Sequence, residues 1–134
     1  MLVRSAGWLA ISLGLATPAQ AENCRLALLL ALDVSASVSP GDDLLQRQGL
    51  ARALLSPAVS EAFLAGDPVA IQIFEWAGAS YQRQLLPDWQ MIRTREDLAR
   101  VAKAVEVPLP PTLDRSRRRT ALGKALAVAH GIFN

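Results

Sequence analysis

The sequence predicts an α/β domain: a mostly parallel central sheet with helices on both faces and one antiparallel edge strand. Two observations lead to this fold class. Residues 25–32 form a short, nearly unbroken apolar run, which is typical of a strand buried on both faces at the centre of a parallel sheet. Helix-start signals and further β-rich runs alternate behind it. With 134 residues, 51% of them hydrophobic, the chain can build one such core but not two.

Residues 1–21 have the three parts of a secretory signal. Arg4 supplies the positive start, residues 6–16 are an apolar stretch, and a small-x-small cleavage site ends at Ala21. The apolar stretch is shorter than the roughly 20 residues that a spanning helix needs, which favours cleavage over a retained anchor. We therefore expect a periplasmic or secreted protein, without stable membrane insertion after cleavage, whose single domain occupies residues 22–134.

Charge and cysteine content narrow the range of partners. The formal net charge is only +2, too weak a field to attract nucleic acid. The one dense basic patch, within residues 115–119, lacks interleaved aromatic side chains that would stack on bases, and we interpret it as a solvated loop. Cys24 is the single cysteine, so it is a free thiol, an intermolecular link or half of a bridge to sequence outside this chain.

Three helices are predicted from their start signals. Residues 39–42 combine a capping serine, a proline suited to the first helical turn and an aspartate that completes a capping box, which predicts a helix to about Leu55. Residues 56–57 repeat the signal for a short helix that Gly66 ends. Residues 94–97 begin a third, followed by apolar side chains at helical spacing.

Further strands and a last helix complete the expected order. Residues 69–76 are β-rich, with Glu75 on the same face as three apolar side chains. Residues 81–86 form a weaker strand, which the short connector can only pair antiparallel to the one before it. Thr120 stands where a helix cap belongs, before an almost wholly apolar helical segment, residues 121–133, that would have to be buried. No strand follows this segment, and we interpret the chain as the N-terminal portion of a longer, incomplete domain.

Asp33, Ser35 and Ser37 come directly after the first predicted strand. Ligands in open α/β sheets bind outside the carboxyl ends of the strands. A carboxylate with hydroxyls suits a hard cation such as Mg²⁺, which takes oxygen ligands and few carboxylates. The alternate spacing lets the three side chains of one tight loop face the same point. Ordinary turn formation explains the local pattern equally well.

The segment Asp33-Val34-Ser35-Ala36-Ser37 resembles the first motif of the metal-ion-dependent adhesion site in von Willebrand factor A domains. Thr120, before a small-residue helix, resembles the second. The resemblance extends over residues 25–133 and is strongest to a group of exported bacterial proteins with this domain. It implies a Rossmann-like fold, in which both serines and the threonine hold the cation and the aspartate often acts through water.

The resemblance also implies the ligands beyond this chain. An acidic side chain of a protein partner completes the shell of the cation, which is Mg²⁺ or Mn²⁺, with Ca²⁺ as a further candidate. The third motif of the family, an aspartate at the end of a later strand, has no counterpart in the sequence. A chain without that strand is expected to bind metal less well and to expose apolar surface.

The sequence thus predicts an exported interaction module rather than an enzyme. The predicted metal ligands are Asp33, Ser35, Ser37 and Thr120. One alternative is a metal-dependent hydrolase of phosphoryl substrates with Asp33 as ligand or nucleophile, although the further acids of such a site are not apparent. Another is a metal-free module whose site serves only structure. The sequence contains no nucleophile elbow and no phosphate-binding glycine loop.

Acidic and aromatic side chains around the predicted hairpin offer a second, weaker candidate site. They are Glu75, Trp76, Asp88 and Trp89. Such residues can form a binding rim, but packing of the tryptophans in the core is the more common use. His130, the single histidine, is interpreted as a packed or surface residue because it lacks a metal-ligating neighbour.

Overall fold

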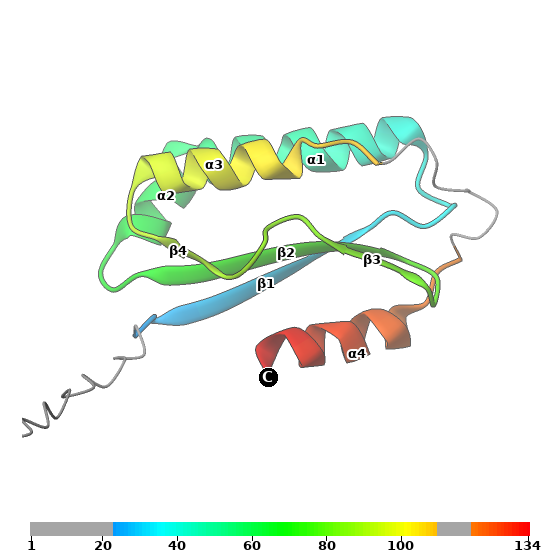
Figure 1. Cartoon of the computed structure of the whole chain (residues 1–134). Helices are drawn as coiled ribbons and strands as arrows, with labels where there is room; N and C mark the ends of the chain where they lie inside the picture. The colour runs from blue at the N-terminus through cyan, green and yellow to red at the C-terminus, as the bar shows by residue number, and fades with distance from the viewer. Residues whose placement is uncertain (1–22, 110–118) are drawn as a thin grey trace, which may run out of the picture.

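The computed structural model describes residues 23–109 and 119–134, which form a small α/β domain with a mixed sheet (Figure 1). The predicted signal sequence, residues 1–21, and most of the basic patch lie outside these residues. The elements are β1 (Leu26–Asp33), α1 (Pro40–Leu55), α2 (Pro57–Leu64), β2 (Val69–Ala77), β3 (Tyr81–Gln84), β4 (Gln90–Ile92), α3 (Arg95–Val105) and α4 (Leu122–Phe133).

The sheet contains one parallel pair and two antiparallel pairs in the described part of the chain. β1 and β2 run parallel, with Asp33 level with Trp76 at their carboxyl ends. β3 and β4 both pair antiparallel with β2, along Phe74–Ala77 and Val69–Ile71 respectively. The expected hairpin is confirmed, but the prediction of a mostly parallel sheet is wrong for these residues. The reason is that the short connector after β2 reverses the chain direction to form β3. The chain then continues along the edge of β2 that faces away from β1, where it forms β4.

β1 is an edge strand within the described residues. It pairs only with β2 there, and Leu26 is 47% exposed. The prediction of a central strand buried on both faces is therefore wrong for this part of the chain. An apolar run indicates that both faces of a strand are covered, but it does not reveal how many strands lie beside it.

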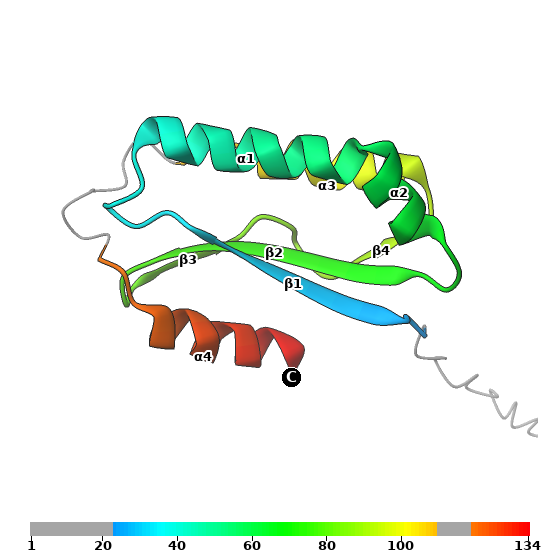
Figure 2. The ribbon, with the colours of Figure 1, turned by 180° about the vertical axis from the view of Figure 1, so that it is seen from behind.

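Helices lie on both faces of the sheet, as predicted. α1, α2 and α3 cover one face and α4 crosses the other (Figures 1 and 2). The larger core lies under α1 and α3; its buried members include Leu32, Leu54, Ile71, Ile73, Ile92, Leu98, Val101 and Val105. On the opposite face Phe74 and Trp76 pack against Ala125 of α4. Burial of each large apolar side chain contributes roughly 1.5–3 kcal/mol, so both layers hold the sheet.

Local signals explain where α1 and α3 begin. Ser39 and Asp42 form a complete capping box at α1, and Thr94 and Asp97 form one at α3. Each box satisfies backbone N–H groups that the first helical turn leaves without partners.

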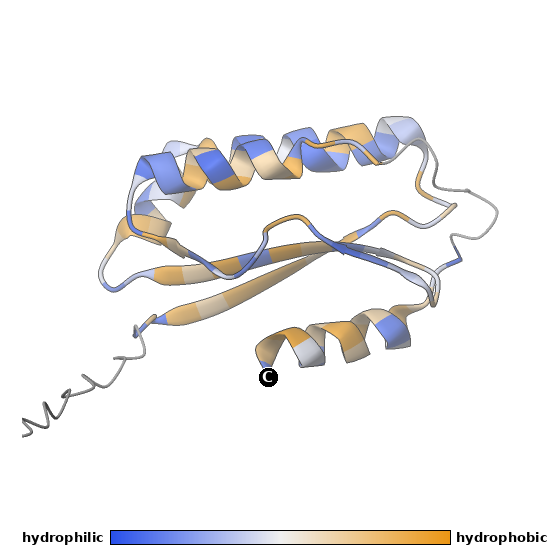
Figure 3. Ribbon diagram, viewed as in Figure 1, coloured by the Kyte–Doolittle hydropathy of each residue, from blue (hydrophilic) through white to orange (hydrophobic). Residues whose placement is uncertain are grey.

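The start of α4 differs from the prediction. Its N-cap is Ala121, and no side chain caps it, so the interpretation of Thr120 as a helix cap is wrong. The predicted burial of this helix is also incomplete, because Leu122 and Leu126 are 60% and 62% exposed. Figure 3 shows that much of α4 is hydrophobic. Within residues 23–109 and 119–134, none of the helices has the length and apolar character needed to cross a membrane.

Candidate metal centre

The loop that follows β1 is held by backbone hydrogen bonds. The Ser35 N–H donates to Oδ1 of Asp33 at 2.8 Å, which closes a tight turn. The Val34 N–H donates to the Trp76 carbonyl at 3.0 Å, and Nε2 of Gln46 donates to the Asp33 carbonyl at 3.3 Å. The loop is therefore fixed to β2 on one side and to α1 on the other.

Hydroxyl groups from both ends of the domain converge at this loop. Ser35 Oγ lies 3.1 Å from Ser37 Oγ. The Thr120 hydroxyl donates to Ser35 Oγ, also at 3.1 Å. Ser35 is fully buried, whereas Ser37 and Thr120 are exposed. The structure thus brings all four predicted ligands to one place, with Ser35 innermost and the other two hydroxyls open to solvent.

The spacing of these oxygens fits an octahedral cation. Because Mg²⁺ binds oxygens at about 2.1 Å with near-ideal octahedral geometry, adjacent ligand atoms lie about 3.0 Å apart. Both hydroxyl separations, at 3.1 Å, are close to that value. No three His, Cys, Asp or Glu side chains in the described ranges form a metal-binding group, so the donor set at this loop is one carboxylate with hydroxyls. Such a set leaves positions for water or a further ligand.

Thr120 reaches the loop because the chain is held to the sheet both before and after it. The carbonyl of Arg119 accepts a hydrogen bond from the Gly78 N–H, in the turn between β2 and β3. Gly78 has a φ of +60°, a conformation that other residues adopt only with strain. On the other side, Ala125 of α4 packs against Phe74 and Trp76. The position of Thr120 is therefore set by β2 in two ways: through the turn that follows β2, and through the face of β2 that packs against α4.

A group of charged side chains and one tyrosine lies beside the site, between α1 and the hairpin, and is centred on the buried Glu75 and Arg47. Its members, which we name the Glu75 cluster, are Asp43, Arg47, Glu75, Tyr81 and Arg83. Nη2 of Arg47 donates to Oε2 of Glu75 at 2.7 Å, and Nε of Arg83 donates to Oε1 at 2.7 Å. Tyr81 also donates to Oε1, and Nε of Arg47 binds both carboxylate oxygens of Asp43 at 3.0 Å.

The Glu75 cluster keeps its charges in spite of burial. Glu75 and Arg47 are 0% and 2% exposed. Burial by itself would raise the pKa of Glu75, but hydrogen bonds from Arg83, Tyr81 and Arg47 outweigh it and hold the pKa below its ordinary value. Burial would lower the pKa of Arg47, and its hydrogen bonds to Asp43 and Glu75 raise it instead. The carboxylate is therefore ionised at neutral pH.

The second candidate site is not assembled as a binding rim. Glu75 belongs to the buried cluster, and Trp76 lies in the core at 6% exposure. Trp89 packs against Phe133, with ring centroids 5.3 Å apart, while Asp88 is exposed. The Glu75 cluster was not predicted, although the sequence contains a signal for it. An acid on the apolar face of a strand needs a charged partner when that face is buried.

His130 is a surface residue, as expected. It is exposed, near the end of α4, and its ring nitrogens lie within hydrogen-bonding distance of the Asn134 side-chain amide.

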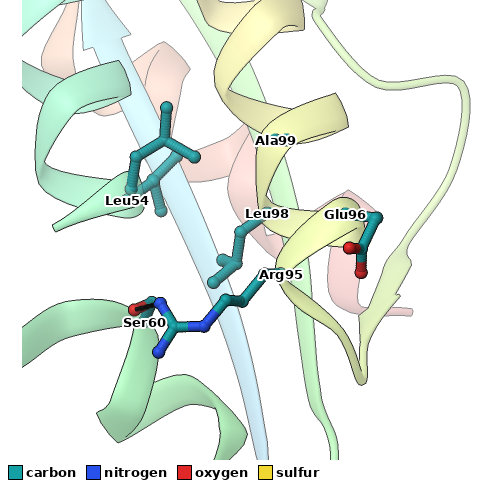
Figure 4. Close-up of a pocket in the computed structure, with 7 residues that line it drawn as sticks. Leu54, Ser60, Arg95, Glu96, Leu98 and Ala99 are labelled. Atoms are coloured by element: carbon teal, nitrogen blue, oxygen red, sulfur yellow. Dashed lines mark hydrogen bonds between the residues drawn. The ribbon is translucent and has the colours of Figure 1, made fainter. Parts of the chain in front are cut away.

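A pocket of about 310 Å³ lies at the far end of α1 from this loop, between α1, α2 and α3 (Figure 4). It is lined by Leu54, Leu55, Ser60, Arg95, Glu96, Leu98 and Ala99. Nη1 of Arg95 donates to Ser60 Oγ at 2.7 Å. The pocket contains none of the predicted ligands, so it is separate from the candidate metal centre.

Comparison with known proteins identifies one family. Residues 23–134 match the model of the family described as "Protein of unknown function (DUF1194)". No curated protein and no solved structure gives a significant match to the chain. The matched range contains every element from β1 to α4, so the β1 loop and Thr120 both lie within it.

Proposed function

We propose that this chain, which belongs to the DUF1194 family, is an exported interaction module that binds a divalent cation and through it an acidic group of a protein partner. The proposed ligands are Asp33, Ser35, Ser37 and Thr120, and the proposed cation is Mg²⁺ or Mn²⁺. When bound, the cation would join the oxygens of this site to a carboxylate of the partner.

The observation that carries this proposal is the meeting of three hydroxyl groups. Two come from the loop after β1 and one from a residue 85 positions later than Ser35. Exposed hydroxyls gain little from bonding each other, because water replaces such a bond at small cost. Ser37 and Thr120 are exposed, yet both point at Ser35 with a spacing suited to adjacent metal ligands. A shared ligand explains that arrangement.

Each residue has a distinct role in the proposed site. Asp33 supplies the negative charge that hydroxyl ligands lack. Ser35 is the buried inner ligand, and its backbone N–H orients the Asp33 carboxylate. Ser37 and Thr120 are the outer ligands. The partner's carboxylate would approach from their side, because solvent reaches the site there.

We further propose that the fold is of the von Willebrand factor A type. The parallel β1–β2 pair, the antiparallel β3 on the outer edge of β2 and the helices on both faces support this. The hydroxyl loop at the carboxyl end of β1 also lies where α/β sheets bind ligands.

Calorimetric titration with Mg²⁺ and with Mn²⁺ tests the metal site. The full-length protein is compared with Asp33→Asn and with Asp67→Asn as a matched control, since Asp67 is an exposed acid in the turn before β2. Asparagine retains an oxygen that can accept from the Ser35 N–H, so the loop keeps its turn while the charge is lost. Binding by the wild type and the control but not by Asp33→Asn is expected. Equal heats in all three proteins would remove the proposal.

A peptide titration tests the acidic partner. A short glutamate-containing peptide is compared with its glutamine counterpart, each in the presence of Mg²⁺ and again after addition of a chelator. Binding of the glutamate peptide alone, and only with metal, is expected because the carboxylate is the ligand that the cation recruits. Binding that persists with chelator would contradict metal-bridged recognition.

A further inference from the structure

Members of the Glu75 cluster lie next to the residues that hold the β1 loop. Gln46, which donates to the Asp33 carbonyl at 3.3 Å, precedes Arg47 in α1. Trp76, whose carbonyl accepts from the Val34 N–H at 3.0 Å, follows Glu75 in β2. Nη2 of Arg47 donates to Oε2 of Glu75 at 2.7 Å. This bond links α1 and β2 at positions adjacent to Gln46 and Trp76, the two residues that hydrogen bond to the β1 loop.

The same cluster holds the other half of the site. Tyr81 and Arg83 of β3 both donate to Glu75 of β2. These side-chain bonds join the two strands of the hairpin next to its turn. The N–H of Gly78 in that turn donates to the carbonyl of Arg119, the residue before Thr120. The position of Thr120 therefore depends on a turn whose two strands are joined through Glu75.

Arg47 also binds the end of α3. Its Nη1 donates to the carbonyls of Val105 and Val107 at 3.2 and 2.8 Å, and Nη2 of Arg83 reaches the carbonyl of Pro108 at 3.5 Å. One buried guanidinium thus joins α1, β2 and the chain leaving α3. A lysine at this position could not make these bonds together, because its single ammonium lacks the planar fork of donors.

Stability alone is a weak explanation for such a cluster. The desolvation of buried charges offsets most of their attraction, and apolar replacements of similar volume often stabilise a protein equally well. Charged groups that hydrogen bond in fixed directions do, however, define one geometry. In metal sites, residues that hydrogen bond directly to the ligands change metal affinity by about 10–100-fold when they are removed. Arg47 and Glu75 act one step further out, through the residues that hold the ligand loop.

We propose that Arg47 and Glu75 are positioning residues: they fix the position of the β1 loop relative to Thr120. Among the residues that the structure describes, neither Arg47 nor Glu75 hydrogen bonds to the side chain of a proposed ligand. The inference rests on the proposed function for its consequence, metal affinity, but the positioning itself is measurable without metal.

The test uses Arg47→Lys and Glu75→Gln in the full-length protein, with Val101→Ala as control. Val101 is 1% exposed in the apolar core under α1 and α3 and lies outside the Glu75 cluster, so its truncation lowers global stability without altering the cluster. Two quantities are measured: the Kd for Mn²⁺, and amide hydrogen exchange at Gly78 relative to amides in the middle of β2. Arg47→Lys retains the charge and carries the test if Glu75→Gln does not fold.

Both cluster variants are expected to weaken Mn²⁺ binding by up to about tenfold, the lower end of the effect of losing a direct partner of a ligand, and to speed exchange at Gly78 selectively. The Val101→Ala control leaves both quantities unchanged. If the wild type binds no Mn²⁺, the proposed function fails, but selective exchange at Gly78 in the cluster variants still supports positioning. Unaltered exchange at Gly78 in Arg47→Lys, or the same change in Val101→Ala, would overturn it.

Discussion

The hydroxyl of Thr120 donates a hydrogen bond to the hydroxyl of Ser35 at 3.1 Å, across 85 residues of sequence. The contact joins the loop above β1 to the start of α4, which lies on the opposite face of the sheet from α1 (Figure 2). Ser35 is fully buried and also lies 3.1 Å from the Ser37 hydroxyl. Oxygens from two parts of the chain thus share one edge of the domain, at the carboxyl ends of the parallel strands.

Replacement of the Thr120 hydroxyl should weaken metal binding. Thr120→Val keeps the shape of the side chain but removes one proposed ligand. We expect the Kd for Mn²⁺ to rise by at least about tenfold, because loss of even a residue that only supports a ligand costs about 10–100-fold in affinity. Thr120→Ser retains the hydroxyl and serves as the control. Calorimetry measures both; a valine variant that binds as tightly as the wild type would exclude Thr120 as a ligand.

Loss of the buried carboxylate should strongly destabilise the domain. Glu75→Leu leaves the 2% exposed Arg47 without its main buried partner, and breaking a buried pair in this way typically costs about 3–5 kcal/mol. Urea unfolding of the variant and of the surface control Asp67→Asn gives the difference in free energy. A cost no larger than that of the control would show that Arg47 does not depend on Glu75.

Tyr81 should titrate at unusually high pH. Burial, and then its hydrogen bond to the Glu75 carboxylate, raises its pKa to about 12. It is the single tyrosine of the sequence, so the absorbance of its phenolate reports this residue alone. A raised folded pKa means that the stabilising contribution is complete below the ordinary tyrosine pKa of 10.0 and is lost as the pH rises toward about 12. The measurement is a spectrophotometric titration of wild type and Glu75→Gln.

The glutamine variant separates the two causes of this shift. Removal of the carboxylate charge should move the Tyr81 pKa down toward its ordinary value, because hydrogen bonding to an anion favours the protonated phenol. An identical titration curve in both proteins would mean that burial acts alone.

Metal should stabilise the folded chain if the site binds it. A ligand at 100 times its Kd raises the free energy of unfolding by about 2.7 kcal/mol when it binds only the folded state. The Tm should therefore be higher in Mg²⁺ than in chelator for the wild type, with no such difference for Asp33→Asn. Equal Tm values in both conditions for the wild type would favour a metal-free structural module.

Local sequence signals predicted the helices well. The capping boxes of α1 and α3 each involve residues three positions apart, so the sequence contains both partners of every bond that starts these helices. The strand pattern likewise predicted β1, β2 and the hairpin. It did not predict β4, a three-residue strand whose pairing with β2 depends on the path of the chain after the hairpin.

The partners of Glu75 could not be predicted in the same way. The strand pattern predicts the correct face of β2 for Glu75, but its partner Arg47 is 28 residues away on α1. Which helix covers that face, and in which rotation, is decided by packing of the whole apolar layer. Distant pairs of this kind leave no periodic trace in the sequence.

The sequence by itself determined the chemical types at the candidate site: one acid and two hydroxyls after an apolar strand, and a threonine before an apolar helix. Only the tertiary structure decided that Thr120 bonds to Ser35 instead of capping α4, and that Glu75 lies buried between two arginines. The physical reason is the sequence separation over which each kind of interaction acts. Caps and strand alternation act between neighbours in sequence, whereas the meeting of distant side chains follows from how the layers pack around the sheet.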